Sequence, residues 1–336
     1  MLSSLIILYL FLNHKIISYN LYKIKDDSMI SKRGDIISDK SNENPDNFET
    51  LYNQTSNPKR KYDSSKKNLI FGVLINYGWI YVQPFFKSFE VVGFENCDCV
   101  IFVSSLSENT INKIESCGVI TKNIPSEYLK MNINKMRWKL YLDYLNENLN
   151  KYNIILHVDT RDVVFQQDLF QLYGSKKPFL GLALEDDNMN EVVNRGWFIY
   201  AFGEDVFKQV KNERVICAGT IWGTADIFFR LVNQIWEIVK KDPSNLKLHD
   251  QSALNYIIYY EKIFNDCLIK TENKDGYILT LGIVKNKSFP FDSEDNLLNE
   301  KGEIVAIVHQ YDRKVDISKK FRKKYIYEGN RNFTKM

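Results

Sequence analysis

The sequence contains little that would indicate a metal-finger or nucleic-acid-binding protein. It has 5 cysteines among 336 residues and no paired Cys-x-x-Cys motif, which argues against a zinc-finger framework, and the odd number leaves at least one thiol free. A formal net charge of +3 is too small to indicate nucleic-acid binding. No internal repeat is evident. With 44% hydrophobic residues, the chain can bury the core of one or two globular domains.

The chain also lacks a clear hydrophobic run long enough to cross a bilayer. The apolar run over residues 2–12 has 11 residues, whereas a spanning helix needs about 20. We interpret residues 1–19 as a signal peptide or a short signal anchor, although no Lys or Arg precedes the run and no clear cleavage site follows it. The protein is therefore expected in the secretory pathway, in the endoplasmic reticulum or Golgi lumen, either secreted or associated with the membrane through this segment. Three Asn-x-Ser/Thr sequons, at Asn53, Asn286 and Asn332, are weak support for a luminal location.

Two further segments flank a predicted catalytic domain at residues 68–313. Residues 20–67 are rich in Ser, Asn, Asp and Lys, cannot bury enough apolar surface to offset the entropy of ordering, and are predicted to form a disordered stem. Residues 314–336 are predicted to be a basic tail, because Lys and Arg cluster at positions 319–324. Such a tail could touch an anionic surface or be a solvated end.

Strand and helix patterns alternate through the first half of the predicted domain. Short apolar runs typical of buried strands alternate with amphipathic stretches, which favours an α/β fold with a mostly parallel sheet. The second half is mixed, so we expect a mixed sheet overall. The predicted strands are 69–75, 98–103, 154–159, 178–184, 214–218 and 304–308, and the predicted helices include 84–92, 110–115, 137–149 and 228–239.

The segment at residues 154–165 is the most informative, because its apolar run is interrupted by Asp159-Thr160-Arg161-Asp162. Open α/β sheets bind ligands at the carboxyl ends of their strands. Two carboxylates there repel each other unless a cation lies between them, and Mg²⁺ or Mn²⁺ held by carboxylates and substrate phosphates is the usual solution. The alternative is that the acids cap the next turn or helix and that Arg161 forms a surface ion pair.

Three more polar clusters follow along the chain. Residues 217–223, Cys-Ala-Gly-Thr-Ile-Trp-Gly, are predicted to form a turn of small residues where backbone approaches a ligand. Residues 249–255, His-Asp-Gln-Ser-Ala-Leu-Asn, form the polar start of a helix, and residues 309–313, His-Gln-Tyr-Asp-Arg, come directly after a strand.

This succession resembles the GT-A fold glycosyltransferases that use nucleotide-diphospho-sugars, especially the family 8-like group. That group carries a DxD-type motif after a central strand, an Asn-Ser/Ala-Gly turn, Asp-Gln-x-x-x-Asn and a late His. The resemblance covers residues 68–313 and implies a Rossmann-like GT-A fold. The chain is a divergent relative, since its acids are spaced D-x-x-D, Cys217 stands where the family usually has Asn, and the late motif is HQYDR.

The resemblance also implies roles for individual residues. An ion, Mn²⁺ or Mg²⁺, would be held by Asp159, Asp162 and His309, with the imidazole favouring Mn²⁺. The donor would be bound by Lys135, Arg137, Asp159 and Gly219, and the catalytic residues would be Asp250 and Gln251. Plainer interpretations stay open: His309 as a hydrogen-bonded core or surface histidine, Arg137 as a helix-start charge, Gly219 as a tight turn and Asp250 as a helix N-cap.

The function expected from the resemblance is metal-dependent transfer of a hexose from a nucleotide-diphospho-sugar to a glycan, protein or lipid acceptor. Glu185 and Asp186, at the end of another predicted strand, could contact sugar or acceptor hydroxyls. One alternative is a sugar-nucleotide-binding relative that has lost turnover. An acid-strand phosphatase is less favoured, because it needs a second Asp two residues after the first, where Arg161 stands.

Overall fold

The computed structural model describes residues 63, 65–172, 177–242, 248–284 and 287–326. The predicted signal segment, most of the predicted stem and the asparagines of all three sequons lie outside these residues. The described residues belong to one unit of the chain, Asn57–Met336. None of their helices combines the length and apolar character needed to cross a membrane.

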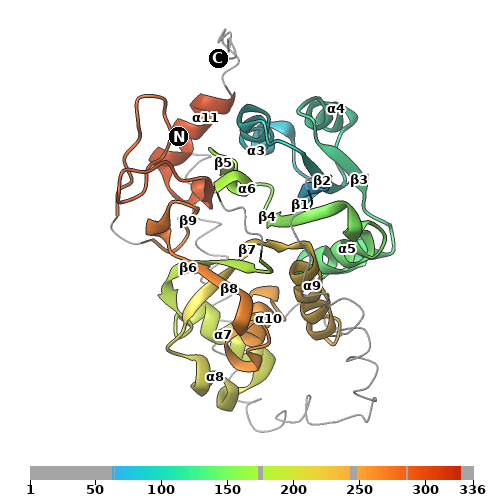
Figure 1. The fold of residues 1–336 in the computed structure, drawn as a ribbon, viewed down its shortest axis with the longest axis vertical. Coiled ribbons are helices and arrows are strands. Elements are labelled where there is room, and N and C mark those ends of the chain that lie inside the picture. Colours follow the sequence, from blue (N-terminus) through green and yellow to red (C-terminus); the bar gives the residue numbers. More distant parts are fainter. Residues whose placement is uncertain (1–62, 64, 173–176, 243–247, 285–286, 327–336) are drawn as a thin grey trace, which may run out of the picture. The chain divides into compact units, whose positions relative to one another are not determined.

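A seven-stranded sheet forms the centre of the domain, in the order β3-β2-β1-β4-β7-β6-β8 (Figure 1). Strands β3, β2, β1 and β4 are parallel to one another, β7 is antiparallel to β4 and β6, and β8 is parallel to β6. This mixed, mostly parallel sheet confirms the predicted α/β fold class. The strands are β1 (Lys67–Ile75), β2 (Cys97–Ser104), β3 (Ile120–Asn123), β4 (Tyr152–Val158), β6 (Leu180–Asn188), β7 (Arg214–Thr224) and β8 (Leu268–Thr271).

Helices cover both faces of this sheet, and the alternation of side chains along β1 shows it. Leu69 and Phe71 belong to one buried cluster, shared with helices α5 and α9, whereas Ile70 and Leu74 belong to another, shared with α3 and α4. A strand buried on both faces needs an unbroken apolar sequence, which explains the pattern of β1. The four helices are α3 (Trp79–Val92), α4 (Glu108–Ser116), α5 (Ile133–Asn148) and α9 (Ala225–Val239).

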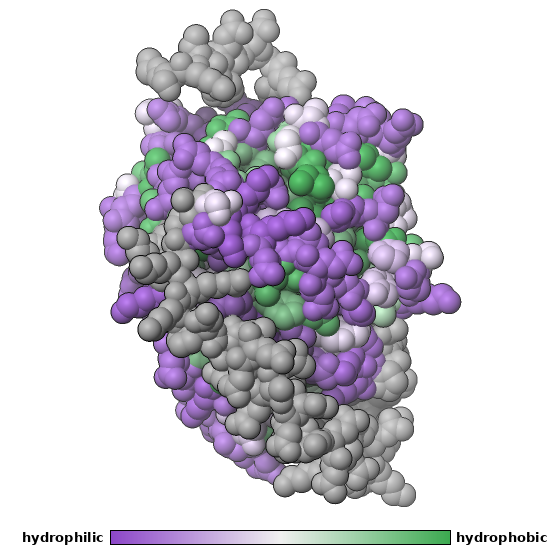
Figure 2. All heavy atoms as spheres, turned by 45° about the vertical axis from the view of Figure 1, so that its right-hand side comes forward, coloured by the Kyte–Doolittle hydropathy of each residue, from purple (hydrophilic) through white to green (hydrophobic). Residues whose placement is uncertain are grey.

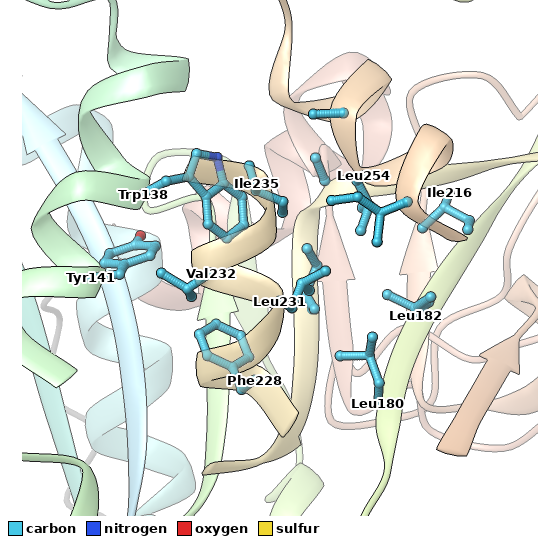
Figure 3. Packing of buried hydrophobic residues seen from close by; sticks show 14 of the residues in the cluster. Trp138, Tyr141, Leu180, Leu182, Ile216, Phe228, Leu231, Val232, Ile235 and Leu254 are labelled. Atoms are coloured by element: carbon cyan, nitrogen blue, oxygen red, sulfur yellow. The ribbon is translucent and has the colours of Figure 1, made fainter. Parts of the chain in front are cut away.

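The packing of α5 against α9 is shown in Figure 3. Trp138 and Tyr141 of α5 face the apolar side of α9, where Phe228, Val232 and Ile235 are fully buried. Burying a large apolar side chain contributes about 1.5–3 kcal/mol, so this contact is a substantial part of the core.

On the face shown in Figure 2, hydrophilic side chains predominate and hydrophobic ones are exposed only in separate areas.

A second group of helices packs beside β6 and β7: α7 (Val192–Phe202), α8 (Glu204–Val210) and α10 (Asp250–Asn255), which continues into a π-helical turn. Asn255 fixes α10 to the sheet, since its Oδ1 accepts from the Ile216 N–H (2.9 Å) and its Nδ2 donates to the Ile216 carbonyl (3.0 Å). The Asn of the Asp-Gln-x-x-x-Asn motif therefore holds the end of α10 next to β7.

A small three-stranded sheet, β5-β10-β9, lies beside the carboxyl end of β4. Its strands are β5 (Val163–Phe165), β9 (Ile278–Thr280) and β10 (Ile307–His309). The pairing of β10 with β5 is antiparallel and sets His309 opposite Val163. The last strand is thus shorter and later than predicted, and His309 is its final residue rather than the residue after it.

The predicted basic tail differs from the structure over residues 315–326, which form helix α11 (Val315–Ile326). Ile317, Phe321 and Tyr325 are buried, and the Gln83 side chain of α3 donates to the Tyr325 carbonyl (3.1 Å). The folded domain consequently extends past residue 313. Charge dominates the composition of the segment, but its three apolar side chains recur every four residues and cover the small sheet.

Candidate active site

The structure brings His309 next to two acids from a distant part of the sequence, Asp159 and Asp162, and we call these three residues the carboxylate–histidine cluster. His309 Nε2 lies 3.5 Å from Asp159 Oδ2 and 3.8 Å from Asp162 Oδ1. One ligand atom from each residue lies within 4.8 Å of the others. Asp159 directly follows β4, Asp162 directly precedes β5, and His309 ends β10. The three residues that the resemblance implies as metal ligands thus lie close together at the carboxyl end of β4.

The carboxylate–histidine cluster fits a divalent cation. His309 is fully buried, and its Nε2 makes no hydrogen bond within the described part of the chain. Buried ring nitrogens are normally satisfied, so one that faces two carboxylates without a hydrogen bond is suited to a metal. Two carboxylate oxygens and one imidazole nitrogen could hold a divalent cation and would leave positions for further oxygen ligands.

The two acids experience different electrostatic environments. Burial alone would raise the pKa of Asp159, but the adjacent His309 and Arg137 outweigh burial and hold the pKa below its usual range. Burial raises the pKa of Asp162, and the negative charge of Asp159 acts in the same direction. Asp159 is therefore the more readily ionised of the pair, and a cation between them would stabilise the charged form of both.

Gly219 contacts this cluster from the middle of β7. The prediction of a turn over residues 217–223 is wrong, because all seven residues lie in the strand. The Asp159 N–H donates to the Gly219 carbonyl (2.9 Å), which continues the pairing of β4 with β7. A Cβ on Gly219 would lie 2.6 Å from Asp159 Oδ2 and 2.7 Å from His309 Nε2. Glycine is needed here so that the two side chains can fit against the strand, rather than to bend it.

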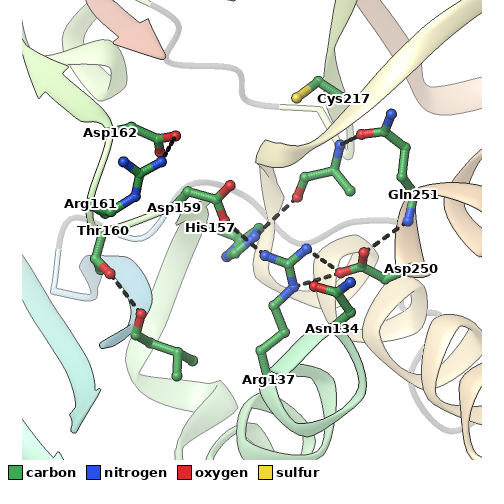
Figure 4. Close-up of polar contacts among 12 residues, drawn as sticks. Asn134, Arg137, His157, Asp159, Thr160, Arg161, Asp162, Cys217, Asp250 and Gln251 are labelled. Atoms are coloured by element: carbon green, nitrogen blue, oxygen red, sulfur yellow. Dashed lines mark hydrogen bonds and ion pairs between the residues drawn. The ribbon is translucent and has the colours of Figure 1, made fainter. Parts of the chain in front are cut away.

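Arg137 of α5 joins the carboxylate–histidine cluster to the Asp-Gln motif (Figure 4). Its Nη1 donates to Asp159 Oδ1 (2.8 Å), its Nε donates to Asp250 Oδ2 (2.6 Å), and its Nη2 also pairs with Asp250. The Trp138 indole donates to the same Asp250 oxygen (2.9 Å), and the Gln251 N–H donates to the other (2.9 Å). Asp250 is buried, and both of its oxygens already accept hydrogen bonds within the protein, Oδ2 from Arg137 and Trp138 and Oδ1 from the Gln251 backbone.

Asp250 also departs from the N-cap interpretation. It is the first residue of α10, and the capping position belongs to His249, whose side chain makes no capping hydrogen bond. The His249 ring instead stacks on Trp197, with ring centroids 3.9 Å apart, and its Nδ1 hydrogen-bonds Asn134 (3.1 Å). Burial lowers the pKa of His249, so the ring is uncharged at neutral pH.

Replacing Arg137 with Met is expected to destabilise the domain by about 3–5 kcal/mol, because it leaves the buried Asp250 carboxylate without its charge partner. Lys135→Met is the matched control on the same helix. Lys135 was expected to bind the donor, and in the structure its Nζ donates to the carbonyls of Lys240 and Asp242. Urea unfolding should show a loss of under about 1 kcal/mol for this control. Equal losses in the two variants would contradict the assigned role of Arg137.

Gln251 is held by two partners that fix its amide. Its Oε1 accepts from the Ala218 N–H (3.2 Å), and its Nε2 donates to Asn194 Oδ1 (2.8 Å). Asn194 is itself buried and donates to Glu191 Oε2 (3.0 Å). This leaves one N–H of the Gln251 amide for a ligand. No motif marked Asn194 in the sequence, because its role depends on the packing of α7 against α10.

Two other polar residues near the site, His157 and Arg161, have structural roles. His157 is buried within β4, where Tyr141 Oη contacts its Nδ1 (2.9 Å) and the Ala218 carbonyl contacts its Nε2 (3.1 Å). Burial lowers the pKa of His157 to about 3, so it is a neutral core histidine. Arg161 forms the predicted ion pair, with its Nη2 2.9 Å from Asp162 Oδ2, and also pairs with Asp312.

The two acids at the end of the predicted strand 178–184 lie within β6, which continues to Asn188. Asp186 accepts from Arg214 Nη2 (3.3 Å) and Asn273 Nδ2 (3.1 Å), so it belongs to a structural network. Glu185 is buried, and burial raises its pKa to about 7. The structure thus separates the two neighbours: Asp186 stabilises the domain, and Glu185 faces the buried side near Cys217 and His309.

Two solved structures are similar to this chain over most of its length. A crystal structure of galactosyltransferase LgtC with donor and acceptor sugar analogues has 15% sequence identity and a TM-score of 0.46, and covers 77% of this chain and 95% of that one. The structure of an LgtC active-site mutant has 14% identity and a TM-score of 0.47, and covers 76% and 94%. Neither a family model nor a curated protein matches the chain. Similarity of this degree carries no argument about activity, which has to come from the site.

Proposed function

We propose that this protein is a metal-dependent glycosyltransferase of the GT-A fold, related to the family 8-like group. It would transfer a hexose from a nucleotide-diphospho-sugar to a glycan, protein or lipid acceptor. The observation that carries the proposal is the meeting of Asp159, Asp162 and His309 at the carboxyl end of β4, with a buried His309 Nε2 that makes no hydrogen bond within the described residues.

The residues of the site support this chemistry in distinct ways. A divalent ion held by the carboxylate–histidine cluster would supply Lewis-acid stabilisation of the leaving diphosphate. Arg137 orients Asp159 through the Nη1 contact and keeps it ionised. Gln251 presents its remaining amide N–H to the donor sugar, in an orientation fixed by Ala218 and Asn194.

Asp250 has a positioning role in this proposal instead of a direct contact with the sugar. Both of its oxygens are engaged by Arg137, Trp138 and the Gln251 backbone. It holds the Arg137 guanidinium in the position from which Nη1 donates to Asp159. The expected location in the secretory pathway, with residues 1–19 as the targeting segment, remains part of the proposal, as does Mn²⁺ as the preferred ion.

Incubation with a panel of UDP- and GDP-sugars and Mn²⁺ is expected to release the free nucleotide from at least one donor. The reaction should stop when EDTA removes the ion and resume when Mn²⁺ is added in excess, because the leaving diphosphate depends on the bound cation. Release would be followed by a nucleotide-detection assay. Repeating the panel with Mg²⁺ tests the preference for manganese.

The panel also separates the proposal from its alternative. Metal-dependent binding of a nucleotide sugar without release, with candidate acceptors present, would favour a sugar-nucleotide-binding relative. Neither binding nor release of any donor would overturn the glycosyltransferase proposal.

A further inference from the structure

Cys217 of β7 contacts His309 on the side of the imidazole ring away from the two acids. Its Sγ lies 3.5 Å from Nδ1, and both side chains are buried. Nε2 faces Asp159 and Asp162. One ring nitrogen of His309, Nε2, therefore faces the carboxylates, and the other, Nδ1, faces the thiol.

A histidine that ligates a metal through one nitrogen usually donates the other N–H to an acceptor, which fixes the tautomer and the orientation of the ring. In the described part of the chain, the hydrogen-bond partner of Nδ1 is Cys217 Sγ. The direction of this bond matters. If the thiol donated its proton to Nδ1, the neutral ring would carry its own proton on Nε2 and could not offer a lone pair there to a cation. Metal binding thus requires Nδ1–H to donate to sulfur.

Once sulfur accepts from Nδ1, the S–H must point elsewhere, because a thiol has a single proton to donate. Glu185 of β6 provides the acceptor. Its strand pairs with β7, where Leu184 lies opposite Ile216, so the next residues of the two strands, Glu185 and Cys217, lie on the same face of the sheet. Glu185 is 4% exposed, and its Oε2 has no hydrogen-bond partner in the described structure. A buried carboxyl with a vacant acceptor position is costly unless a donor approaches it.

We propose that Cys217 and Glu185 form a buried relay that positions His309 for metal binding, with Nδ1–H donating to sulfur and S–H donating to the Glu185 carboxyl. Both are positioning residues, since neither touches the reacting atoms. The proposal rests on the proposed function, because it assumes that His309 binds the ion. It also gives a reason for cysteine at a position where the family that this sequence resembles usually has Asn: a thiol can accept from one neighbour and donate to the next.

The test is Mn²⁺ binding to the full chain without any donor sugar, measured by electron paramagnetic resonance of the free ion. Cys217→Ala removes both hydrogen bonds and should weaken Mn²⁺ binding by about 10- to 100-fold, the usual effect of losing an outer-shell partner. Cys217→Ser keeps one donor and one acceptor, so its dissociation constant should stay within about threefold of the original. Glu185→Leu removes the final acceptor and should weaken binding by about tenfold.

A second readout follows the tautomer directly. Nitrogen-15 spectra of histidine-labelled, metal-free protein, recorded at a pH where the His309 ring is neutral, should show a protonated Nδ1 and an unprotonated Nε2, assigned with His309→Ala among the 4 histidines of the chain. Circular dichroism verifies that each variant is folded. Equal Mn²⁺ affinity in Cys217→Ala and Cys217→Ser, or an unprotonated Nδ1, would overturn the relay while leaving the proposed function intact. Absence of Mn²⁺ binding in the unaltered protein would overturn both.

Discussion

Replacing Asp162 with Asn is expected to lower turnover of the preferred nucleotide sugar by about 1,000-fold, the equivalent of about 4 kcal/mol in the transition state. The amide has nearly the shape of the carboxylate, so packing in this buried position is retained. What is lost is one of the two negative charges that face His309, and with it the affinity of the carboxylate–histidine cluster for a divalent ion. Nucleotide release and Mn²⁺ affinity, measured on the same preparation, should fall together.

Asp312→Asn is the matched control for this variant. Arg161 pairs with both Asp162 and Asp312, but Asp312 is not one of the three residues that could hold the ion. If Asp162 acts only through Arg161, the two variants should lose similar activity. The metal assignment instead predicts that Asp312→Asn retains Mn²⁺ affinity. If the Asp162→Asn enzyme kept full activity at limiting Mn²⁺, Asp162 would not be a metal ligand.

The sequence was most informative where burial on both faces of the sheet imposes a pattern. Strands β1 and β4 are continuous apolar runs because helices cover both sides, so their positions and the acids after β4 could be predicted. The apolar stripe of α9 likewise follows from packing against one face of the sheet.

A turn was predicted within β7, at residues 217–223, because the central residues of this strand are small and its apolar pattern is broken. The glycines here are required by side chains that are distant in the sequence. A Cβ on Gly181 of β6 would lie 2.1 Å from the Trp222 ring, and one on Gly219 would meet His309. Gly181 and Trp222 are opposite each other in the sheet. Short-range sequence patterns do not reveal such cross-strand requirements.

The contacts of Asp250 could not be predicted, since its partner Arg137 is 113 positions away and reaches it only after α5 and α10 have packed on the sheet. For α11, in contrast, a usable signal existed. Ile317, Phe321 and Tyr325 recur at intervals of four, which predicts a helix with one buried face, although basic residues surround them. The basic composition of this segment therefore did not indicate its amphipathic helix.

Gly219→Ala is expected to reduce turnover by about 100-fold or more, although a single methyl group is added. The new Cβ would lie 2.6 Å from Asp159 Oδ2 and 2.5 Å from His309 Cε1, distances at which the two side chains or the strand must move. Displacing a reacting group or a ligand by about 1 Å can cost a hundredfold in rate. Mn²⁺ affinity should fall in parallel, because the displaced atoms belong to the carboxylate–histidine cluster. Steady-state kinetics and Mn²⁺ titration would measure both effects.

Gly223→Ala provides the control for strain within the same strand. Its Cβ would lie 2.7 Å from the Phe179 carbonyl, so β7 is overpacked here as well, but against backbone instead of Asp159 and His309. Overpacking costs about 1–3 kcal/mol of stability, and both variants should therefore unfold at lower urea concentrations. Only Gly219→Ala should lose Mn²⁺ affinity, because only its methyl group enters the space between the two candidate ligands. Equal Mn²⁺ affinities in the two variants would mean that Gly219 serves the strand and not the metal site.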